Sequence, residues 1–295
     1  MKKVTLPGMT EFSEINLLFL SFYRDARDIF FDDVAIESVY GGFSGSRWCG
    51  GRNNFGPLSD IGKIRNLISM YNELGVGCNA TFTNQYVDAA AIEDDAYSRQ
   101  IAEALAASSP VRNGVIIFSN EVNAYVKSNH PQLIRVSSTT KEIESKEAIE
   151  QELAGFDRVV LSYNLTKDEG FIRELSRPDK IEVMVNEYCM LRCPFRKVHY
   201  SKTSEDQVKG RPSGFTCKHE ASPQAYGFLQ GLLYGDAFLR NEDASRYSKD
   251  LNIEHFKIVG RGLARYDIVD SYLYYLVKPE HWYEVRDYLI HRNYL

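Results

Sequence analysis

The sequence predicts an α/β protein with a TIM-barrel-like (β/α)8 fold and a long insertion after the seventh strand. Three observations lead to this prediction. Apolar runs of strand length occur eight times, helical patterns follow most of them, and the chain of 295 residues exceeds the ~250 residues of a typical barrel. Strands that alternate with helices pair in parallel through right-handed crossovers, and eight such units close into a barrel.

Each predicted strand is a short apolar run that ends in small or polar residues. The first run has the weakest pattern. The predicted strands span residues 3–6, 34–40, 77–83, 114–118, 133–137, 158–162, 180–186 and 253–258.

The clearest predicted helix lies in "SDIGKIRNLISMYNELG", where Ile61, Ile64, Leu67, Ile68 and Tyr71 fall on one face. The glycine at 75 is typical of the residue that ends a helix, and the proline at 279 suits a first helical turn. A pair of helices over 270–289 is expected to cover the barrel. Further helices are predicted at residues 13–31, 96–107, 120–129, 146–153 and 168–175, and over the closing "VKPEHWYEVRDYLIHR".

The insertion spans residues 201–252, which show no clean alternation and are rich in Ser, Gly, Lys and Asp. It carries Cys217. The sequence contains no Pro/Gly linker that would mark a second domain, so residues 1–295 are predicted to form a single barrel domain.

Composition excludes several classes of protein. The net charge of -5 gives no general attraction to phosphate backbones, so a nucleic-acid partner is not indicated beyond a modest local basic patch near Lys197 and Lys218. The sequence has no apolar run of membrane-span length, and "MKKVTLPGMTEF" lacks the core of a signal peptide. We therefore expect a cytoplasmic protein without a membrane partner, whose five cysteines are reduced.

The C-terminal ends of barrel strands, and the loops after them, converge on one face. Asn84 and Asn120 follow two of the strands there and are candidates for substrate binding. The loop "YGGFSGSRWCGGRNN" follows the second strand, and its Arg47 and Arg52 could hold a carboxylate or phosphate of a substrate. A loop packed by Trp48 with arginines at the surface is an equally weighted alternative.

The cysteines give the sharper signal. Cys189 and Cys193 stand four positions apart in a polar loop after the seventh strand, and Cys217 lies in the insertion that must return to the barrel. Nearby Arg and Lys residues are expected to lower the thiol pKa values and favour metal-binding thiolates. Three sulfurs suit zinc, with a histidine as fourth ligand, or an iron–sulfur cluster. Cys49 is either a fourth sulfur or a chance thiol, and Cys78 is predicted to be buried in a strand.

The segments "VNEYCMLRCPFRKVHY", "FTCKHE" and "IEHFKIVGR" resemble the collagenase-like U-thirty-two (U32) peptidase family. The resemblance covers residues 180–277 and departs from the family pattern at Val259, where a glutamate is usual. It implies a barrel that holds a 4Fe–4S cluster, here through Cys189, Cys193 and Cys217, and it makes Cys49 a candidate to complete the cluster. Members of the family include oxygen-independent hydroxylases that act on small molecules and RNA.

The same resemblance implies roles for residues around the thiols. Glu187, Arg196 and His199 become candidates for catalysis, and Arg261 becomes a candidate for substrate binding. Each of them also has an alternative structural interpretation, in which it pairs with a neighbouring carboxylate or carbonyl group.

Three functional hypotheses remain open at this stage. The first is an iron–sulfur-dependent redox enzyme, with hydroxylation of a small molecule or modified polymer as one such reaction, and with an electron-transfer or complex partner. The second is a peptidase or other hydrolase with a structural zinc, although a sulfur-rich ligand set makes zinc a poor activator of water. The third is a non-catalytic, metal-bearing subunit of a complex.

Overall fold

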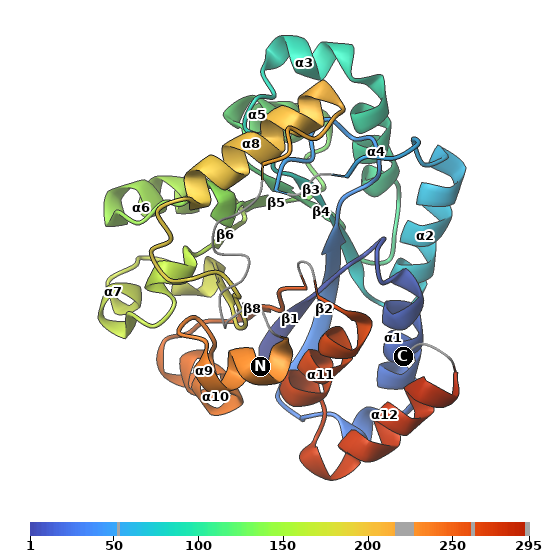
Figure 1. The fold of residues 1–295 in the computed structure, drawn as a ribbon, viewed down its shortest axis with the longest axis vertical. Coiled ribbons are helices and arrows are strands. Elements are labelled where there is room, and N and C mark those ends of the chain that lie inside the picture. Colours follow the sequence, from blue (N-terminus) through green and yellow to red (C-terminus); the bar gives the residue numbers. More distant parts are fainter. Residues whose placement is uncertain (52–53, 216–226, 261–262, 293–295) are drawn as a thin grey trace.

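The strands of the protein form a closed barrel (Figure 1). The computed structural model describes residues 1–51, 54–215, 227–260 and 263–292. All eight strands pair in parallel with their neighbours in chain order, from β1 against β2 round to β8 against β1. The predicted barrel is therefore confirmed. The strands are β1 Lys2–Pro7, β2 Val34–Gly41, β3 Gly77–Phe82, β4 Gly114–Ile117, β5 Ile134–Ser137, β6 Arg158–Val160, β7 Ile181–Met184 and β8 His255–Lys257.

Helices surround the strands (Figure 1). The helix expected over 13–31 ends earlier, at Asp25, and a 3-10 turn over Arg27–Ile29 continues the segment. The helices are α1 Ser13–Asp25, α2 Ile61–Glu73, α3 Ala89–Asp94, α4 Ala96–Ala106, α5 Asn120–Asn129, α6 Lys146–Gly155, α7 Glu169–Arg173, α8 Arg196–Lys209, α9 Phe228–Tyr234, α10 Asn241–Asp250, α11 Arg265–Leu276 and α12 Trp282–His291.

Polar side chains fix the starts of many helices, because they accept hydrogen bonds from backbone N–H groups that have no partner within the helix. Asp60 accepts from the N–H of Lys63 at the start of α2, and Ser119 accepts from two N–H groups of α5. Gly75 follows α2 with φ +78°, the left-handed conformation that suits glycine after a helix. These local signals explain why α2 and α5 could be predicted from the sequence.

The main hydrophobic core lies between the strands and the surrounding helices. Helix α2 contributes Ile64, Ile68 and Tyr71 to it, as its sequence pattern predicted. Cys78 is fully buried in the same core, so its prediction as a buried residue is confirmed. Burial of this many apolar side chains is the main stabilising contribution to the fold.

Helix α8 lies across the C-terminal mouth of the barrel. At one end Arg196 contacts the ring of Tyr163, beyond β6, and at the other end Gln207 donates a hydrogen bond to the carbonyl of Ser46, beyond β2. In Figure 1 the helix passes from the side of α6 to the side of α3. Its 14 residues give it a length of about 21 Å, enough to bridge the mouth.

The part of the chain between β7 and β8 also contains α9 and α10, so the long excursion holds three described helices. The sequence analysis did not predict α8, because its buried face is polar and includes Ser204, Asp206 and Gln207. An apolar stripe, which is the usual helix signal, is therefore weak there.

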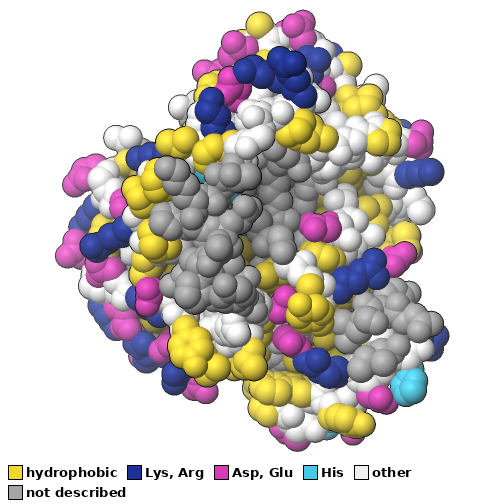
Figure 2. All heavy atoms as spheres, viewed as in Figure 1, with side chains coloured by type: hydrophobic (Ala, Val, Ile, Leu, Met, Phe, Trp, Pro, Cys, Tyr) yellow, Lys and Arg dark blue, Asp and Glu magenta, His cyan; other side chains and the backbone are white. Residues whose placement is uncertain are grey.

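The surface carries charges of both signs. In Figure 2, which has the same viewpoint as Figure 1, acidic side chains lie among Lys and Arg side chains around the edge of the molecule. Within the described ranges, the structure contains no helix that is both long and apolar enough to cross a membrane.

The interior of the barrel contains charged side chains, whereas branched apolar residues usually fill such barrels. Arg158 of β6 lies 2.8 Å from the carboxylate of Glu37 and 3.9 Å from that of Glu182. His255 and Lys257 of β8 approach Glu37 at 3.2 Å and Glu182 at 3.6 Å. Neighbouring strands therefore bring five ionisable groups into one network.

The environment of Glu37 leads us to expect a loss of stability in acid. Burial disfavours its charged form, but the hydrogen bond to His255 and the charge of Arg158 outweigh this and lower its pKa from 4.5 to about 2. A carboxyl whose pKa is lowered on folding stabilises the native state above its unfolded value, and this stabilisation disappears as pH falls from about 4.5 to about 2. We expect a loss on the order of 3 kcal/mol over that window. Urea unfolding of wild type and Glu37→Gln at several pH values measures it; equal acid sensitivity of the two proteins would contradict the assignment.

Candidate active site

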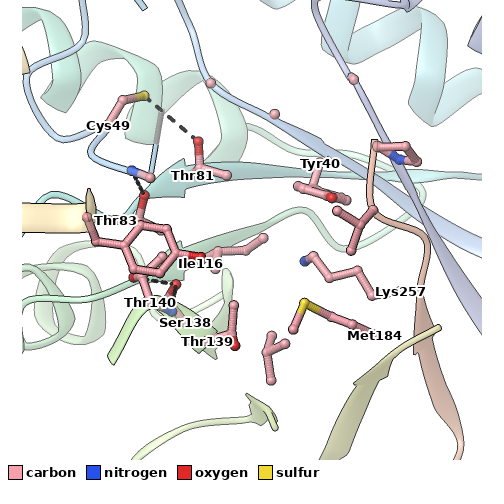
Figure 3. A pocket seen from close by; sticks show the side chains of 18 of the residues that line it. Tyr40, Cys49, Thr81, Thr83, Ile116, Ser138, Thr139, Thr140, Met184 and Lys257 are labelled. Atoms are coloured by element: carbon pink, nitrogen blue, oxygen red, sulfur yellow. Dashed lines mark hydrogen bonds between the residues drawn. The ribbon is translucent and has the colours of Figure 1, made fainter. Parts of the chain in front are cut away.

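A cavity of about 530 Å³ lies at the C-terminal mouth of the barrel. Strand ends form its floor, with Tyr40 from β2, Ile116 from β4, Met184 from β7 and Lys257 from β8 (Figure 3). Its size falls within the range of small-molecule sites. The location is the face where barrel enzymes place their chemistry, as the sequence analysis expected.

One wall of the cavity is rich in hydroxyl groups. Thr83, Ser138, Thr139 and Thr140 lie together on the side opposite Lys257 (Figure 3). The hydroxyls of Ser138 and Thr140 are 2.9 Å apart, and Thr83 accepts a hydrogen bond of 2.8 Å from the N–H of Gly51. Hydroxyl groups both donate and accept, so this wall suits a polar, oxygen-bearing ligand.

Lys257 occupies the floor of the cavity. Its Nζ lies 3.8 Å from the centre of the Tyr40 ring and 3.6 Å from Glu182 Oε1, which is within ion-pair distance but too long for a hydrogen bond. The side chain is buried, and Nζ has no hydrogen-bond partner within the described structure. A buried amine without a hydrogen bond lowers the stability of the folded protein. Its presence here makes Lys257 a candidate for a functional group.

Glu187 and Arg196 form a buried ion pair at the cavity edge. Arg196 donates from Nη2 to Glu187 Oε2 at 2.9 Å, and its Nε lies 3.2 Å from Glu142 Oε1. The guanidinium also lies between two aromatic rings, 4.1 Å from that of Tyr163 and 5.1 Å from that of Tyr200. Two carboxylates and two ring faces therefore fix its orientation, and the pair is positioned to organise the loop beside it.

The cysteine loop begins at this ion pair. The N–H of Cys189 donates to Glu187 Oε1 at 3.0 Å, and a turn at Arg192 with φ 54° leads to Cys193. Both thiols are half-buried. The prediction of a lowered thiol pKa is wrong for Cys189. Burial is the largest influence and raises the pKa of this thiol; Arg196 acts to lower it, and Glu187 and Cys193 raise it further.

Cys49 also borders the cavity, from the loop after β2. It is buried, and its Sγ lies 3.9 Å from the hydroxyl of Thr81 (Figure 3). Burial raises the pKa of this thiol, which keeps it neutral. Trp48 beside it is fully buried against Phe82 and Tyr125, at ring distances of 4.8 and 5.6 Å. Trp48 therefore packs the loop, as the second interpretation of its sequence predicted.

The predicted substrate-binding residues occupy different environments. Asn84 is fully buried, and its amide donates to the carbonyls of Arg47, Cys49 and Ser204 at 2.9 to 3.1 Å. Arg47 and Asn120 are exposed and do not line the cavity. Asn84 thus holds the loop after β2 against α8.

The other predicted site residues are distributed as follows. His199 lies on α8, half-buried, with its ring 5.7 Å from that of Phe215. Val259, at the position where the resembling family usually has glutamate, lines the cavity, and Asn186 bonds both its N–H and its carbonyl group. Arg52, Cys217 and Arg261 lie outside the described residues.

The donor set for a metal is incomplete in the part of the chain that the structure describes. Within residues 1–51, 54–215, 227–260 and 263–292, no group of three or more His, Cys, Asp or Glu side chains could hold a metal ion. Cys189 and Cys193 are two half-buried thiols of one short loop, outside the lining of the cavity, and two sulfurs would supply only part of a sulfur-ligated centre. A third sulfur would have to come from Cys49 or Cys217.

Comparison with known proteins places this geometry in a known fold. The structure of the U32 peptidase Mk0906 matches with a TM-score of 0.56 and 12% sequence identity, covering 89% of this chain and 94% of that chain. The chain has a U32 peptidase fold. This confirms at the level of the fold what the sequence resemblance predicted. No family model matches the chain, and neither does any curated protein sequence.

The sequence analysis missed Lys257 as a residue that lines the cavity. A signal was present, because a strand with one buried face alternates its side chains, and "HFK" places His255 and Lys257 on the face opposite to Phe256. The hydroxyl-rich wall was not predicted as a binding surface. Which of those hydroxyls face the cavity depends on loop conformation and is not encoded in the local pattern.

Proposed function

We propose that the chain is a redox enzyme whose active site is the cavity at the barrel mouth, with an iron–sulfur cluster held by Cys189, Cys193 and Cys217. One observation carries this proposal. The Glu187–Arg196 ion pair lines the cavity, and Glu187 also accepts a hydrogen bond from the N–H of Cys189, so the cysteine loop adjoins a chamber of ligand size. A small polar molecule is the favoured substrate, because hydroxyl groups line one wall.

Each part of the chain has a distinct role in this proposal. A bound cluster would supply electron transfer or an open iron for an oxygen-bearing group. Glu187 and Arg196 position the loop, and the hydroxyls of Ser138 and Thr140 orient the substrate. The apolar cluster that contains Val160 and Met184 limits access of water from below. An external electron-transfer partner belongs to the same proposal.

Metal analysis tests this proposal. Protein prepared without oxygen from cells competent in cluster assembly is expected to contain iron and acid-labile sulfide. Cys189→Ala, Cys193→Ala and Cys217→Ala are each expected to lose most of the iron, because each removes a thiolate ligand. Cys49→Ala shows whether a fourth thiolate is used.

Cys78→Ala serves as the matched control, since Cys78 is buried in the main core and should leave the iron content unchanged. A colourless wild-type protein without iron, or equal iron in all variants, would remove the cluster from the proposal.

Peptide hydrolysis is the second candidate, because the matched structure with this fold is described as a U32 peptidase. Hydrolysis of a peptide panel by iron-free protein, lost in Glu187→Gln and retained in the exposed-site variant Glu174→Gln, would favour this candidate over the redox enzyme.

A further inference from the structure

The most unusual group in the cavity is the amine of Lys257. It is 5% exposed and lies at the floor of the cavity, where its buried nitrogen stands between Tyr40 and Met184 (Figure 3). The neighbouring Glu182 Oε1, 3.6 Å away, also has no hydrogen-bond partner among the described residues. An acceptor and a donor thus lie close together without being bonded, at the place where a ligand would enter.

Burial favours the neutral form of this amine. It is the largest influence on Lys257 and lowers its pKa; Glu182 acts in the opposite direction, Arg158 lowers the pKa further, and the net direction is downward. The charged and titratable groups that face Lys257 or its ion-pair partners are Glu182, Arg158, Glu37, His255 and Tyr40. A lowered pKa increases the share of Lys257 that is neutral at a given pH, and the neutral amine carries the lone pair that a nucleophile needs.

The cavity around the amine suits a small carbonyl compound. Ile116, Val160 and Met184 surround the floor with apolar surface, which keeps the reacting centre away from water. Hydroxyls of Ser138 and Thr140 lie on the opposite wall, where they can bond oxygen atoms of a bound molecule. Exposed Glu11 at the rim shows that the cavity reaches the surface.

We propose that Lys257 forms an imine with the carbonyl group of a small polar aldehyde or ketone bound in this cavity. The amine nitrogen attacks the carbonyl carbon and forms a C–N bond, giving a carbinolamine. Glu182 accepts a proton from the nitrogen and returns it to the departing hydroxyl group. Both amine hydrogens leave with the carbonyl oxygen as one water molecule, so the step needs no oxidant or reductant.

This chemistry is independent of the thiols. Lys257 belongs to β8 and contacts Glu182 and Tyr40, whereas Cys189 and Cys193 belong to the loop after β7. An iron-free protein would therefore still form the imine. The iron content tests the proposed redox enzyme, and labelling of Lys257 tests the imine, so the two proposals can fail separately.

Labelling with a small diketone tests the proposal. Pentane-2,4-dione reacts with neutral amines to give a conjugated enaminone, which absorbs in the near ultraviolet and adds the mass of the diketone less one water. We expect the full-length protein at neutral pH to be modified at Lys257 at least about tenfold faster than at other lysines. The rate at Lys257 should also reach its maximum at a lower pH than the rate at exposed lysines. Peptide mass mapping identifies the modified residue.

The chain contains two matched controls. Lys141 is also buried, but its Nζ is held 2.6 Å from Glu152, and Lys209 is half-exposed. Lys257→Arg keeps a long basic side chain without a primary amine and is expected to lose the near-ultraviolet product, whereas Glu182→Gln is expected to slow its formation. Modification of Lys257 no faster than that of Lys209 would overturn the proposal, and this measurement on wild type holds even if a variant fails to fold.

Discussion

Arg158→Met is expected to lower the free energy of unfolding by about 3–5 kcal/mol, because it removes the cation between two carboxylates and leaves Glu37 with His255 and Glu182 with the more distant Lys257. The Arg158 side chain is 6% exposed and lies between Glu37 and Glu182, at 2.8 and 3.9 Å. Methionine matches the length of the arginine stem but supplies no charge. Urea unfolding followed by circular dichroism measures the change.

Arg177→Met is the matched control for this prediction. Arg177 pairs with Asp179 at 2.6 Å but is 54% exposed, and surface pairs of this kind contribute about 0–1 kcal/mol. The double variant Arg158→Met with Glu37→Gln should be less destabilised than Arg158→Met, since one of the stranded charges is removed. Equal costs for Arg158→Met and Arg177→Met would show that the interior network contributes no more than a surface pair.

Asn84→Ala is expected to cost about 3 kcal/mol or more, although the side chain does not line the cavity. The Asn84 amide donates to three carbonyl groups, and its oxygen accepts a hydrogen bond of 2.8 Å from the N–H of Tyr86. Alanine removes these hydrogen bonds, and the carbonyls of Arg47 and Cys49 and the N–H of Tyr86 each lose a partner at about 1–3 kcal/mol. The loop is close to Asn84, because a side chain at Gly50 would meet the Asn84 backbone at 2.3 Å.

Asn120→Ala provides the comparison for Asn84→Ala. Asn120 also follows a strand, but it is exposed at the first position of α5, where alanine is a good helix former. We expect a change within about 0.5 kcal/mol. Hydrogen exchange should increase over residues 46–51 in Asn84→Ala and stay unchanged in Asn120→Ala; similar exchange in both variants would contradict the role given to Asn84.

These two asparagines illustrate what the sequence could predict. Both follow strands, so their placement at the C-terminal face followed from the barrel alone. Their different roles depend on α8, whose Ser204 carbonyl reaches Asn84 from 120 positions away. Local patterns do not contain such contacts, and they also did not predict α8 itself, because its buried face is polar.

The strands were predictable for the opposite reason. Apolar runs of four to eight residues bounded by small or polar residues are local signals, and each of the eight runs corresponds to a strand of the barrel. The charged interior was overlooked, because Glu37, Arg158, Glu182 and Lys257 lie in runs that were read for their apolar residues. A single charge in a strand becomes interpretable only when closure of the barrel shows which charge faces it.

The position of α8 has a consequence for the order of folding. Gln207 meets Ser46 across 161 positions of the chain, and Ser204 meets Asn84 across 120. Contacts between such distant segments carry a large loop-closure entropy and form after local structure. The chamber should therefore assemble late, once both halves of the cylinder have joined, and an isolated half-barrel fragment would lack it entirely.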